Sequence, residues 1–439
     1  MTRYVIVGAG AAGISAAEAI RSQDTRGEIH MVTEDPFGYY SRPGLAYLLT
    51  GELDEKSLYP FSDENFKHLG IRLHRTQISR VDSIAHRLFN AHEKSIPYDR
   101  LLIATGSTAV RGAIPGLQLE GVVKLDNLTD ARLILKSARR GRPAVVIGGG
   151  ITALEILEGL VSKGMKVHYF LRGDRYWSNV LDEIESHIVE QRLKDEGVQI
   201  HYHTETDVIL GKKGRVAGVR TKQGQVIACD LVAVAIGVQP RKELAEASGL
   251  QVERGILVND YLQTNQPDVF AAGDAAQVYD PLTGKSILDT LWGPAREQGF
   301  IAGLNMTGKS NSFTKPPAFN VTRLAGLTTT IIGTVGTGQN ADLVGIARGE
   351  SESWRQVPDA IAAQNNFEVN RIRILVGWRT LLGAVVMGDQ TASRPLQKLI
   401  RGQVDISRLR DRLLVPGAPL GKLVTEFWKE TADGNSQQP

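Results

Sequence analysis

The stretch Tyr4-Val5-Ile6-Val7-Gly8-Ala9-Gly10-Ala11-Ala12-Gly13 decides the fold, because it joins an apolar strand to a helix through a glycine-rich turn. The residues that come next, from Ser15 to Ile20, are rich in alanine and continue the predicted helix. In a turn of this kind the glycines let backbone N–H groups approach a pyrophosphate at the positive end of the helix. The stretch therefore predicts a dinucleotide-binding turn.

The same pattern returns at Gly148-Gly149-Gly150-Ile151-Thr152-Ala153, between the apolar run Ala144 to Ile147 and the helical sequence Leu154 to Val161. A single match of this kind is a weak indication of a nucleotide site. Two matches, each between a strand and a helix and about one domain length apart, favour two dinucleotide sites. The competing interpretation is two tight turns in an ordinary α/β sheet.

The two turns differ in the residues that stand after the next strand. After Ile29 to Thr33 comes Glu34, whose carboxylate can accept hydrogen bonds from both hydroxyls of an adenosine ribose, which suits FAD or NAD. After Val167 to Leu171 there is no acid, but Arg172 and Arg175 are present. Guanidinium groups there can bind the 2′-phosphate of NADP, which a carboxylate would repel. The alternative is that both arginines cap a solvated loop.

The composition is that of a globular protein with two to four domains, since 42% of the 439 residues are hydrophobic and 23% are charged. No apolar run reaches the roughly 18 to 20 residues of a membrane span. A net charge of +3 is too small to indicate a nucleic-acid partner. The small residues near the N-terminus belong to the glycine-rich turn and not to a signal peptide, so we expect a cytoplasmic protein.

Cys229 is the only cysteine of the sequence. It lies in the apolar run from Gln225 to Val232, which predicts a strand and a small structural role for the thiol. A single cysteine excludes a disulfide, a cysteine metal cluster or a pair of redox thiols within one chain. We predict no metal site.

Three further apolar runs open into small residues. Tyr98 to Ala104 leads into Thr105 and Gly106, and Leu231 to Ile236 leads into Gly237. Val269 to Ala272 leads into Gly273-Asp274, where the glycine permits close approach and the aspartate can bond a sugar-alcohol hydroxyl. Each of these segments is expected to bring the backbone next to a bound nucleotide.

Taken in order, these segments resemble the two-dinucleotide flavoproteins of the pyridine nucleotide-disulfide oxidoreductase superfamily, over roughly residues 1 to 310 and more weakly beyond. The resemblance implies an α/β fold with two Rossmann-like domains, the NAD(P) domain being inserted in the FAD domain, and a C-terminal α+β domain. The implied boundaries are 1–112 and 244–312 for the FAD domain, 113–243 for the NAD(P) domain, 316–430 for the C-terminal domain and 432–439 for a disordered tail.

The resemblance also implies which residues bind the two cofactors. Alanine at 153 together with Arg172 is similar to the NADP-using glutathione reductases, so NADPH is expected over NADH. Glu155 can equally be a carboxylate on a helix face, and Trp292 can be a core aromatic. FAD would be held by Gly8, Gly10, Ala12, Gly13, Glu34, Arg42, Ile78, Thr105, Gly106, Gly273, Asp274 and Trp292, and NADPH or NADH by Gly148, Gly150, Ala153, Glu155, Arg172, Arg175 and Gly237.

The segment from Tyr39 to Tyr47 separates branches of the superfamily. Disulfide reductases carry two cysteines beside the flavin and the peroxidase and oxidase branch carries one, whereas this segment has no thiol. Its Arg42-Pro43-Gly44-Leu45 core is similar to ferredoxin and rubredoxin reductases, and Trp292 to Gly299 resembles the Trp-x-x-Ala-x-x-Gln-Gly segment of the same branch. Those enzymes often have lysine where Tyr47 stands, which leaves the role of Tyr47 open.

That branch implies a flavin-dependent NAD(P)H oxidoreductase of the electron-carrier reductase type. A hydride would pass from reduced nicotinamide to FAD, and electrons would then pass singly to a small protein acceptor, a rubredoxin, a ferredoxin or a nitrite reductase partner. No side chain needs to act as nucleophile or proton donor in the hydride step. The alternatives are an NAD(P)H oxidase that reduces oxygen directly and a redox-sensing interaction protein similar to apoptosis-inducing factor.

The last third of the chain reads as a separate domain that resembles the C-terminal domain of rubredoxin reductases and nitrite reductases. Its basic residues predict a docking face for a small acidic electron carrier, because complementary charge raises encounter rates. A basic surface with no partner, or one buried in a homodimer, is the alternative. The predicted strands are Phe319–Thr322, Thr328–Gly333, Arg371–Val376 and Leu381–Met387, the helices are Pro395–Ile400 and Leu409–Leu414, and nine basic residues (Arg371, Arg373, Arg379, Arg394, Lys398, Arg401, Arg408, Arg410, Arg412) stand against Asp389, Asp405 and Asp411.

Overall fold

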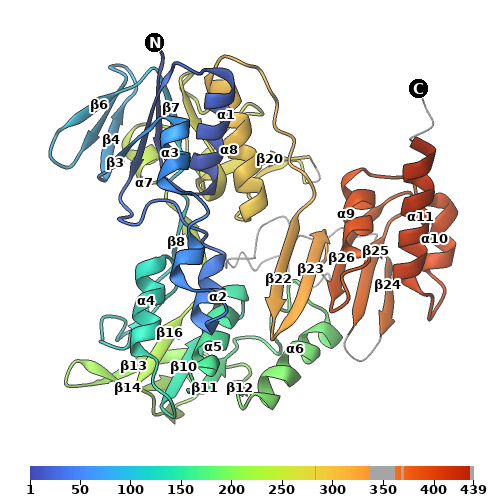
Figure 1. Ribbon diagram of the computed structural model, residues 1–439. Helices are drawn as coiled ribbons and strands as arrows, with labels where there is room; N and C mark the ends of the chain where they lie inside the picture. The colour runs from blue at the N-terminus through green and yellow to red at the C-terminus, as the bar shows by residue number, and fades with distance from the viewer. Residues whose placement is uncertain (282, 337–360, 367–369, 436–439) are drawn as a thin grey trace. The chain divides into compact units, whose positions relative to one another are not determined.

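The computed structural model describes residues 1–281, 283–336, 361–366 and 370–435 (Figure 1). The described residues form two compact units, which are treated separately. Unit 1 contains residues 1–169 and 205–315, and unit 2 contains residues 170–204 and the described residues from 316 onward. The predicted α/β fold is confirmed, while the predicted domain boundaries stay a prediction.

The first sheet of unit 1 joins the beginning of the chain to a much later segment. Its strands are parallel, in the order β19 (Val269–Ala271), β7 (Arg100–Ile103), β1 (Arg3–Val7), β2 (Glu28–Thr33) and β3 (Ile71–Arg75). Nearly all of β1, β2 and β7 is buried, as expected for parallel strands covered by helices. These strands place the first glycine turn, the Thr105-Gly106 turn and the Gly273-Asp274 turn at the same edge, because each comes after the carboxyl end of a strand.

Two helices of unit 1 pack tightly against each other beside this sheet (Figure 1). They are α1 (Ala11–Gln23) and α8 (Trp292–Met306). Close approach depends on glycine, since a Cβ at Gly299 would lie 2.1 Å from the backbone oxygen of Ala12, and one at Gly303 would lie 2.5 Å from that of Ala16. The beginning of the chain and residues near 300 therefore share one core.

A second sheet of unit 1 holds the second glycine turn. In it β10 (Pro143–Ile147) is parallel to β16 (Leu231–Val234), with β11 (Lys166–Phe170) next to β10 and β9 (Val122–Val123) next to β16. The turn leads into α5 (Ile151–Ser162). Both glycine turns thus have the predicted context of strand, turn and helix.

Cys229 does not lie in a strand, contrary to the prediction. Strand β15 (Val226–Ile227) ends before it, and β16 begins after it. The chain leaves an antiparallel sheet, formed by β13 (Thr206–Lys212), β14 (Arg215–Thr221) and β15, and must turn there to enter the parallel sheet. The thiol is nevertheless buried, with 2% exposure.

Shorter elements complete unit 1. They are α2 (Gly44–Thr50), η1 (Glu55–Leu58), α3 (Asp63–Leu69), β4 (Ile78–Asp82), β5 (Arg87–Asn90), β6 (Ser95–Pro97), β8 (Ser107–Ala109), α4 (Leu128–Ser137), β17 (Val238–Pro240), α7 (Glu243–Ala247), β18 (Ile256–Leu257), η2 (Gly273–Ala275), β20 (Ala276–Asp280) and β21 (Lys285–Leu288).

Unit 2 is built on a five-stranded antiparallel sheet. All the strands and helices predicted for the last third of the chain are present, and β24 and α11 were not predicted. Helix α11 includes residues 432–435 of the segment predicted to be disordered, and 436–439 lie outside the described residues. In order the strands are β22 (Phe319–Leu324), β23 (Leu327–Gly333), β26 (Leu381–Met387), β25 (Arg371–Val376) and β24 (Ile361–Asn366), and the helices are α6 (Glu183–Asp195), α9 (Ser393–Arg401), α10 (Ser407–Leu413) and α11 (Leu420–Asn435), with the short strand β12 (Gln199–His201).

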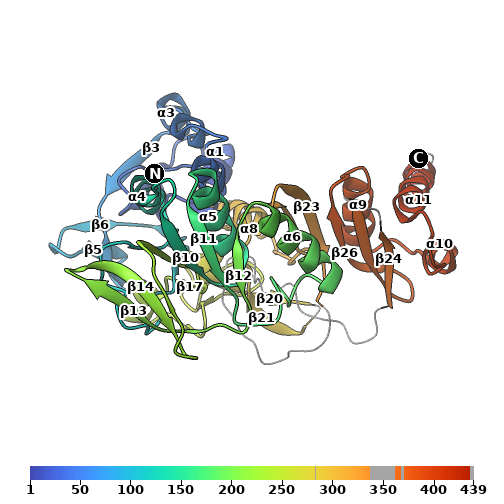
Figure 2. The ribbon, with the colours of Figure 1, turned by 90° about the horizontal axis from the view of Figure 1, so that it is seen from below.

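The two faces of β25 pack against different helices. Ile374 and Val376 belong to the apolar core shared with α9, α10 and α11. The alternate residues Arg371 and Arg373 point the other way and form ion pairs with Asp182 and with Glu185 of α6. Figure 2 shows α6 and α11 on opposite sides of β26.

This packing corrects one expectation from the sequence. Arg371 and Arg373 are 1% and 3% exposed, so they do not belong to a cationic surface. The Arg373 guanidinium is 2.9 Å from both carboxylate oxygens of Glu185, which is fully buried. Removing one partner of such a buried pair costs roughly 3 to 5 kcal/mol, so these residues fasten α6 to the sheet.

Candidate dinucleotide-binding sites

The first glycine turn is held against the strand next to it. Gly8 has a φ of +120°, and a Cβ there would lie 2.0 Å from the backbone oxygen of Ala104. A Cβ at Gly13 would lie 2.0 Å from the oxygen of Gly8 itself. Only glycine fits at these two positions, which explains the spacing that the sequence shows. Ala12 lies between them in the sequence and is close to Gly273. A Cβ built on Gly273 would be 3.1 Å from the Ala12 methyl group.

Gly10 is open toward the N-terminus of α1. It caps the helix without a side-chain hydrogen bond, and a Cβ placed there would meet no atom within 4 Å. The first N–H groups of a helix have no partner inside the helix, and an anion can supply one. The space at Gly10 therefore fits the pyrophosphate of a dinucleotide.

A buried donor lies close by, on α8. The Gln298 side chain is fully buried, and its oxygen accepts a hydrogen bond from the backbone N–H of Gly273 at 2.8 Å. Its Nε2 has no hydrogen-bond partner among the described residues. A buried amide donor without a partner is costly, so the region fits a bound group that carries acceptors, such as FAD.

Asp274 and Thr105 are already oriented by neighbouring groups. The Ser107 hydroxyl donates to Asp274 at 2.7 Å, and the Thr105 hydroxyl donates to the backbone oxygen of Arg241 at 2.7 Å. Gly106 has a φ of +73° and leaves open space where a Cβ would stand. These three predicted FAD residues thus come together with the first glycine turn, through the sheet of unit 1.

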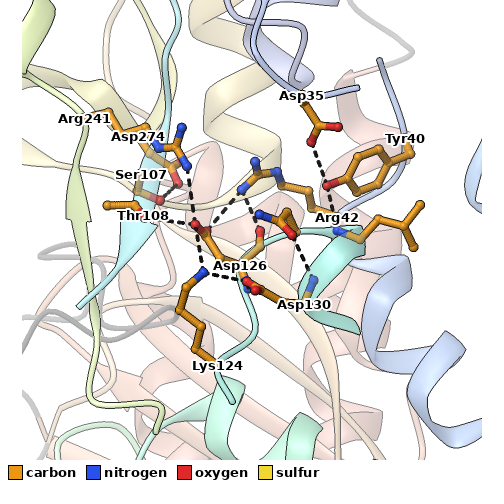
Figure 3. Close-up of polar contacts among 12 residues, drawn as sticks. Asp35, Tyr40, Arg42, Ser107, Thr108, Lys124, Asp126, Asp130, Arg241 and Asp274 are labelled. Carbon is orange, nitrogen blue, oxygen red and sulfur yellow. Dashed lines mark hydrogen bonds and ion pairs between the residues drawn. The ribbon is translucent and has the colours of Figure 1, made fainter. Parts of the chain in front are cut away.

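A buried carboxylate that the sequence did not single out organises the polar side chains of this region. Asp126 is 1% exposed, and Thr108 donates a hydrogen bond to it at 2.9 Å. Figure 3 shows Arg42, Lys124 and Arg241 converging on it. Their nitrogen atoms lie 3.5, 3.8 and 3.4 Å from its carboxylate oxygens, respectively. The guanidinium of Arg42, a residue predicted to lie near the flavin, is therefore bound by Asp126.

Glu34, the predicted ribose-binding acid, forms an ion pair with Arg241, which is labelled in Figure 3. The Glu34 side chain is about half exposed, at 47%. Arg241 bridges Glu34 to Asp126, two residues far apart in the sequence. A ribose hydroxyl and a guanidinium N–H are both donors to a carboxylate, so the acceptor that the prediction requires is present just beyond β2.

Tyr40, Ile78 and Trp292 also belong to unit 1. Tyr40 donates to Asp35 at 3.1 Å and accepts from the N–H of Leu128 at 3.0 Å, and burial raises its pKa to about 12. Ile78 is buried at the start of β4. Trp292 is the first residue of α8 and is 46% exposed, so it is not an aromatic residue of the core.

The second glycine turn repeats the geometry of the first. Gly148 has a φ of +140°, and a Cβ there would lie 2.1 Å from the backbone oxygen of Ala235. Gly150 caps α5 without a side-chain hydrogen bond, and Ala153 is fully buried. Glu155 lies on α5, half-buried. A small pocket lies at this turn, lined by Ala109, Leu125, Gly150, Thr152, Val234, Ala235, Gly237 and Val238.

Arg172 and Arg175 belong to unit 2 and differ in their surroundings. Arg172 is exposed, two residues beyond β11. Arg175 is partly buried, and its guanidinium lies 3.1 Å from Asp174 and 3.4 Å from the backbone oxygen of Ser178. Arg172 is therefore the more accessible of the two cations, and the assignment of both to a 2′-phosphate stays a prediction.

Two glycine turns at the carboxyl ends of parallel strands, each leading into a helix with an uncapped N-terminus, define a class of proteins that bind two dinucleotides. The model of the pyridine nucleotide-disulphide oxidoreductase family matches residues 2–299. The chain belongs to this family. It is an oxidoreductase whose cofactors are FAD and NAD(P)H.

Curated relatives extend the comparison beyond the family model. The NAD(P)H nitrite reductase of Bacillus subtilis (strain 168) is 28% identical over 92% of this chain and 48% of that protein, so the chain spans about half its length. The rubredoxin-NAD(+) reductase of Ectopseudomonas oleovorans is 30% identical over 72% of this chain and 82% of that protein.

The solved structure of a covalent putidaredoxin reductase–putidaredoxin complex has the same fold. It superposes with a TM-score of 0.85, covers 97% of this chain and 98% of that chain, and is 21% identical in sequence. Within the parts of the chain that the structure describes, no helix is both long and apolar enough to cross a membrane.

Proposed function

We propose that this protein is an NADPH-dependent electron-carrier reductase that passes electrons from FAD to a small acidic redox protein. The observation that carries the proposal is the absence of any cysteine from Tyr39 to Tyr47, where thiol-dependent branches of the family have their redox group. The similarity to a rubredoxin-NAD(+) reductase supports a one-electron protein acceptor. FAD, when bound, accepts a hydride from reduced nicotinamide and releases electrons one at a time.

The residues of unit 1 would bind and orient the cofactors. The open helix N-termini at Gly10 and Gly150 would receive the two pyrophosphates, and Glu34 would accept hydrogen bonds from the FAD ribose. Arg42, held by Asp126, would lie near the flavin. Such positioning contributes several kcal/mol to a reaction between two bound rings, and it requires no side-chain nucleophile.

Cys229 should be dispensable for electron transfer. Burial raises the pKa of its thiol to about 12, so it stays protonated and unreactive at neutral pH. Cys229→Ala should therefore keep kcat within about twofold of wild type, measured as NADPH-dependent reduction of a small dye. A loss of FAD reduction in a variant that still binds FAD would mean that the thiol takes part, and would return the protein to the thiol-dependent branch.

The acceptor would dock on the exposed basic residues of α9 and α10. We call Arg401, Arg408 and Arg412 the basic face; all three are exposed. Arg410 is less available, since it stacks over the ring of Trp378 at 4.7 Å, and Arg379 is paired with Asp405 at 3.0 Å. Small iron-sulfur and rubredoxin-like carriers are commonly acidic, so complementary charge would speed their encounter with this face.

Reversing the charge of the basic face should slow reduction of the protein acceptor. For the triple variant Arg401→Glu, Arg408→Glu and Arg412→Glu, we expect the rate with an acidic rubredoxin or ferredoxin to fall about tenfold or more at low salt. The wild-type rate should fall as salt rises, because charges are screened beyond roughly 8 to 10 Å at physiological ionic strength. Both rates are measured by stopped-flow absorbance of the carrier.

The matched control is reduction of a small uncharged dye, which should be the same in the triple variant and in wild type. If the variant reduces each carrier as fast as wild type at low salt, the basic face is not the docking site. Rapid oxygen consumption without any carrier would instead favour an NAD(P)H oxidase. Negligible turnover with a change of oligomeric state on NADPH addition would favour a redox-sensing protein.

The compartment and the oligomeric state belong to the same proposal. A cytoplasmic location fits the composition, which carries one cysteine in 439 residues. The alternative is that the basic face is buried in the interface of a homodimer. Sedimentation of the wild type and of the triple variant would separate the two uses, because only a dimer interface would make the variant dissociate.

A further inference from the structure

The second glycine turn contains a buried hydroxyl that no neighbouring residue uses. Thr152 is the second residue of α5 and is 8% exposed. Its Oγ1 has no hydrogen-bond partner within the described parts of the chain. A buried polar group without a partner lowers stability, so its presence at this position indicates a role in binding.

Thr152 lines the pocket at the second turn, and its surroundings restrict what the pocket can bind. The other lining residues are apolar or glycine, and none of them carries a charge. A pyrophosphate needs cations or several N–H donors, which these walls do not offer beyond the helix end at Gly150. A flat uncharged ring with a single polar substituent matches apolar walls with one hydroxyl.

The place of the pocket in the fold indicates the same kind of ligand. Val234 and Ala235 stand where β16 ends, and Gly150 begins α5. Ligands of open parallel sheets bind at the carboxyl ends of strands beside helix N-termini. Ala109 and Val238, which belong to the paired strands β8 and β17, line the same pocket.

We propose that Thr152 is a binding residue for the nicotinamide half of the pyridine nucleotide, and that its hydroxyl hydrogen-bonds the carboxamide and so fixes the orientation of the ring. The inference rests on the proposed function for the identity of the nucleotide and deepens it, because it assigns one end of the nucleotide to one pocket. Reduced nicotinamide is flat and uncharged, and its carboxamide is the polar substituent that the hydroxyl would meet.

The test uses the full-length, FAD-loaded protein and the variant Thr152→Val, which replaces the hydroxyl by a methyl group of similar size. Dissociation constants are measured by calorimetry for NADP⁺ and NAD⁺, which carry the same carboxamide as the reduced coenzymes but do not reduce FAD, and for 2′-phospho-ADP-ribose and ADP-ribose, which lack the nicotinamide ring. We expect about tenfold weaker binding of the preferred dinucleotide, which corresponds to about 1.4 kcal/mol, and unchanged binding of its ring-less fragment. Thr152→Ser, which keeps the hydroxyl, should bind as wild type does.

A stability measurement separates this role from a structural one. Because the hydroxyl has no partner in the described structure, Thr152→Val should unfold at the same temperature as wild type or higher when no pyridine nucleotide is present. Thr206 supplies a matched control, since its hydroxyl is also buried without a described partner but does not line the pocket. Thr206→Val should leave all four dissociation constants unchanged.

Two outcomes would overturn the inference while leaving the proposed function intact. One is a Thr152→Val protein that binds the dinucleotide as tightly as wild type. The other is equal weakening of the dinucleotide and of its ring-less fragment, which would move the hydroxyl to the pyrophosphate or the adenosine. A wild-type protein that binds neither NADP⁺ nor NAD⁺ would overturn the proposed function and the inference together.

Discussion

Glu34→Arg should yield a protein without FAD, whereas the wild type should be yellow with one FAD per chain. Glu34 would accept hydrogen bonds from two ribose hydroxyls, each worth roughly 1.5 to 3 kcal/mol when the acceptor is charged. Losing both lowers the affinity by about a hundredfold or more. The new cation would also stand beside Arg241, the present partner of Glu34. FAD content is measured from the ratio of absorbance at 450 and 280 nm.

The ion pair between Glu34 and Arg241 calls for a control that breaks the pair and keeps the carboxylate. Arg241→Gln does this, and we expect it to retain FAD. Glu93→Arg introduces the same charge change at a side chain that is 73% exposed, and it should also stay yellow. If Glu34→Arg purifies with as much FAD as wild type, Glu34 does not bind the ribose. A colourless wild type that cannot be reconstituted with FAD would end the flavoprotein interpretation.

Both glycine turns could be predicted from the sequence because their requirements are local. A Cβ at Gly8 or Gly148 would overlap the backbone of a neighbouring strand, so glycine must stand there whatever the rest of the chain does. The strands that precede the turns are continuous apolar runs, which periodicity reveals. Such short-range constraints determine the positions of both turns and the α/β class.

The polar cluster around Asp126 could not be predicted in the same way. Asp126 meets Arg42 and Arg241 through contacts between residues far apart in the sequence, and an aspartate in a polar stretch gives no sign that it will be buried. Arg241 comes directly after β17, but its pairing with Glu34 depends on how the strands are ordered. Only the fold brings these charges together.

The basic stretch of unit 2 shows how charge counting fails without burial. Arg371 and Arg373 alternate with Ile372 and Ile374, a period of two that indicates a strand with one polar face. That face packs on α6, where Asp182 and Glu185 neutralise the arginines. The acids come from a segment nearly 200 residues earlier, so the sequence around β25 could not show that these two cations are buried.

The choice between NADPH and NADH should depend chiefly on Arg172. Arg172 is exposed two residues beyond β11, in the loop where an acid would select NAD, whereas Arg175 is paired with Asp174. Arg172 is thus the residue most available to a 2′-phosphate. A charge-assisted hydrogen bond to that phosphate contributes roughly 1.5 to 3 kcal/mol, so kcat/KM should favour NADPH over NADH by about tenfold or more.

Arg172→Glu should erase or invert this preference. The substitution removes the cation, repels the phosphate and offers acceptors for the ribose hydroxyls of NADH, so the ratio of kcat/KM for NADPH to that for NADH should fall by about a hundredfold. The ratio is measured with a small dye as acceptor, so that docking of a protein partner does not contribute.

Two neighbouring variants make the result specific to Arg172. Arg172→Lys keeps the charge but loses the planar fork, so it should retain part of the preference for NADPH. Asp174→Asn releases Arg175 from its acid, and the preference for NADPH should rise if Arg175 also reaches the phosphate. Equal use of both coenzymes by the wild type would mean that Arg172 and Arg175 are solvated residues of the loop after β11 and do not bind the phosphate. The second site would then bind NAD and NADP without distinguishing them.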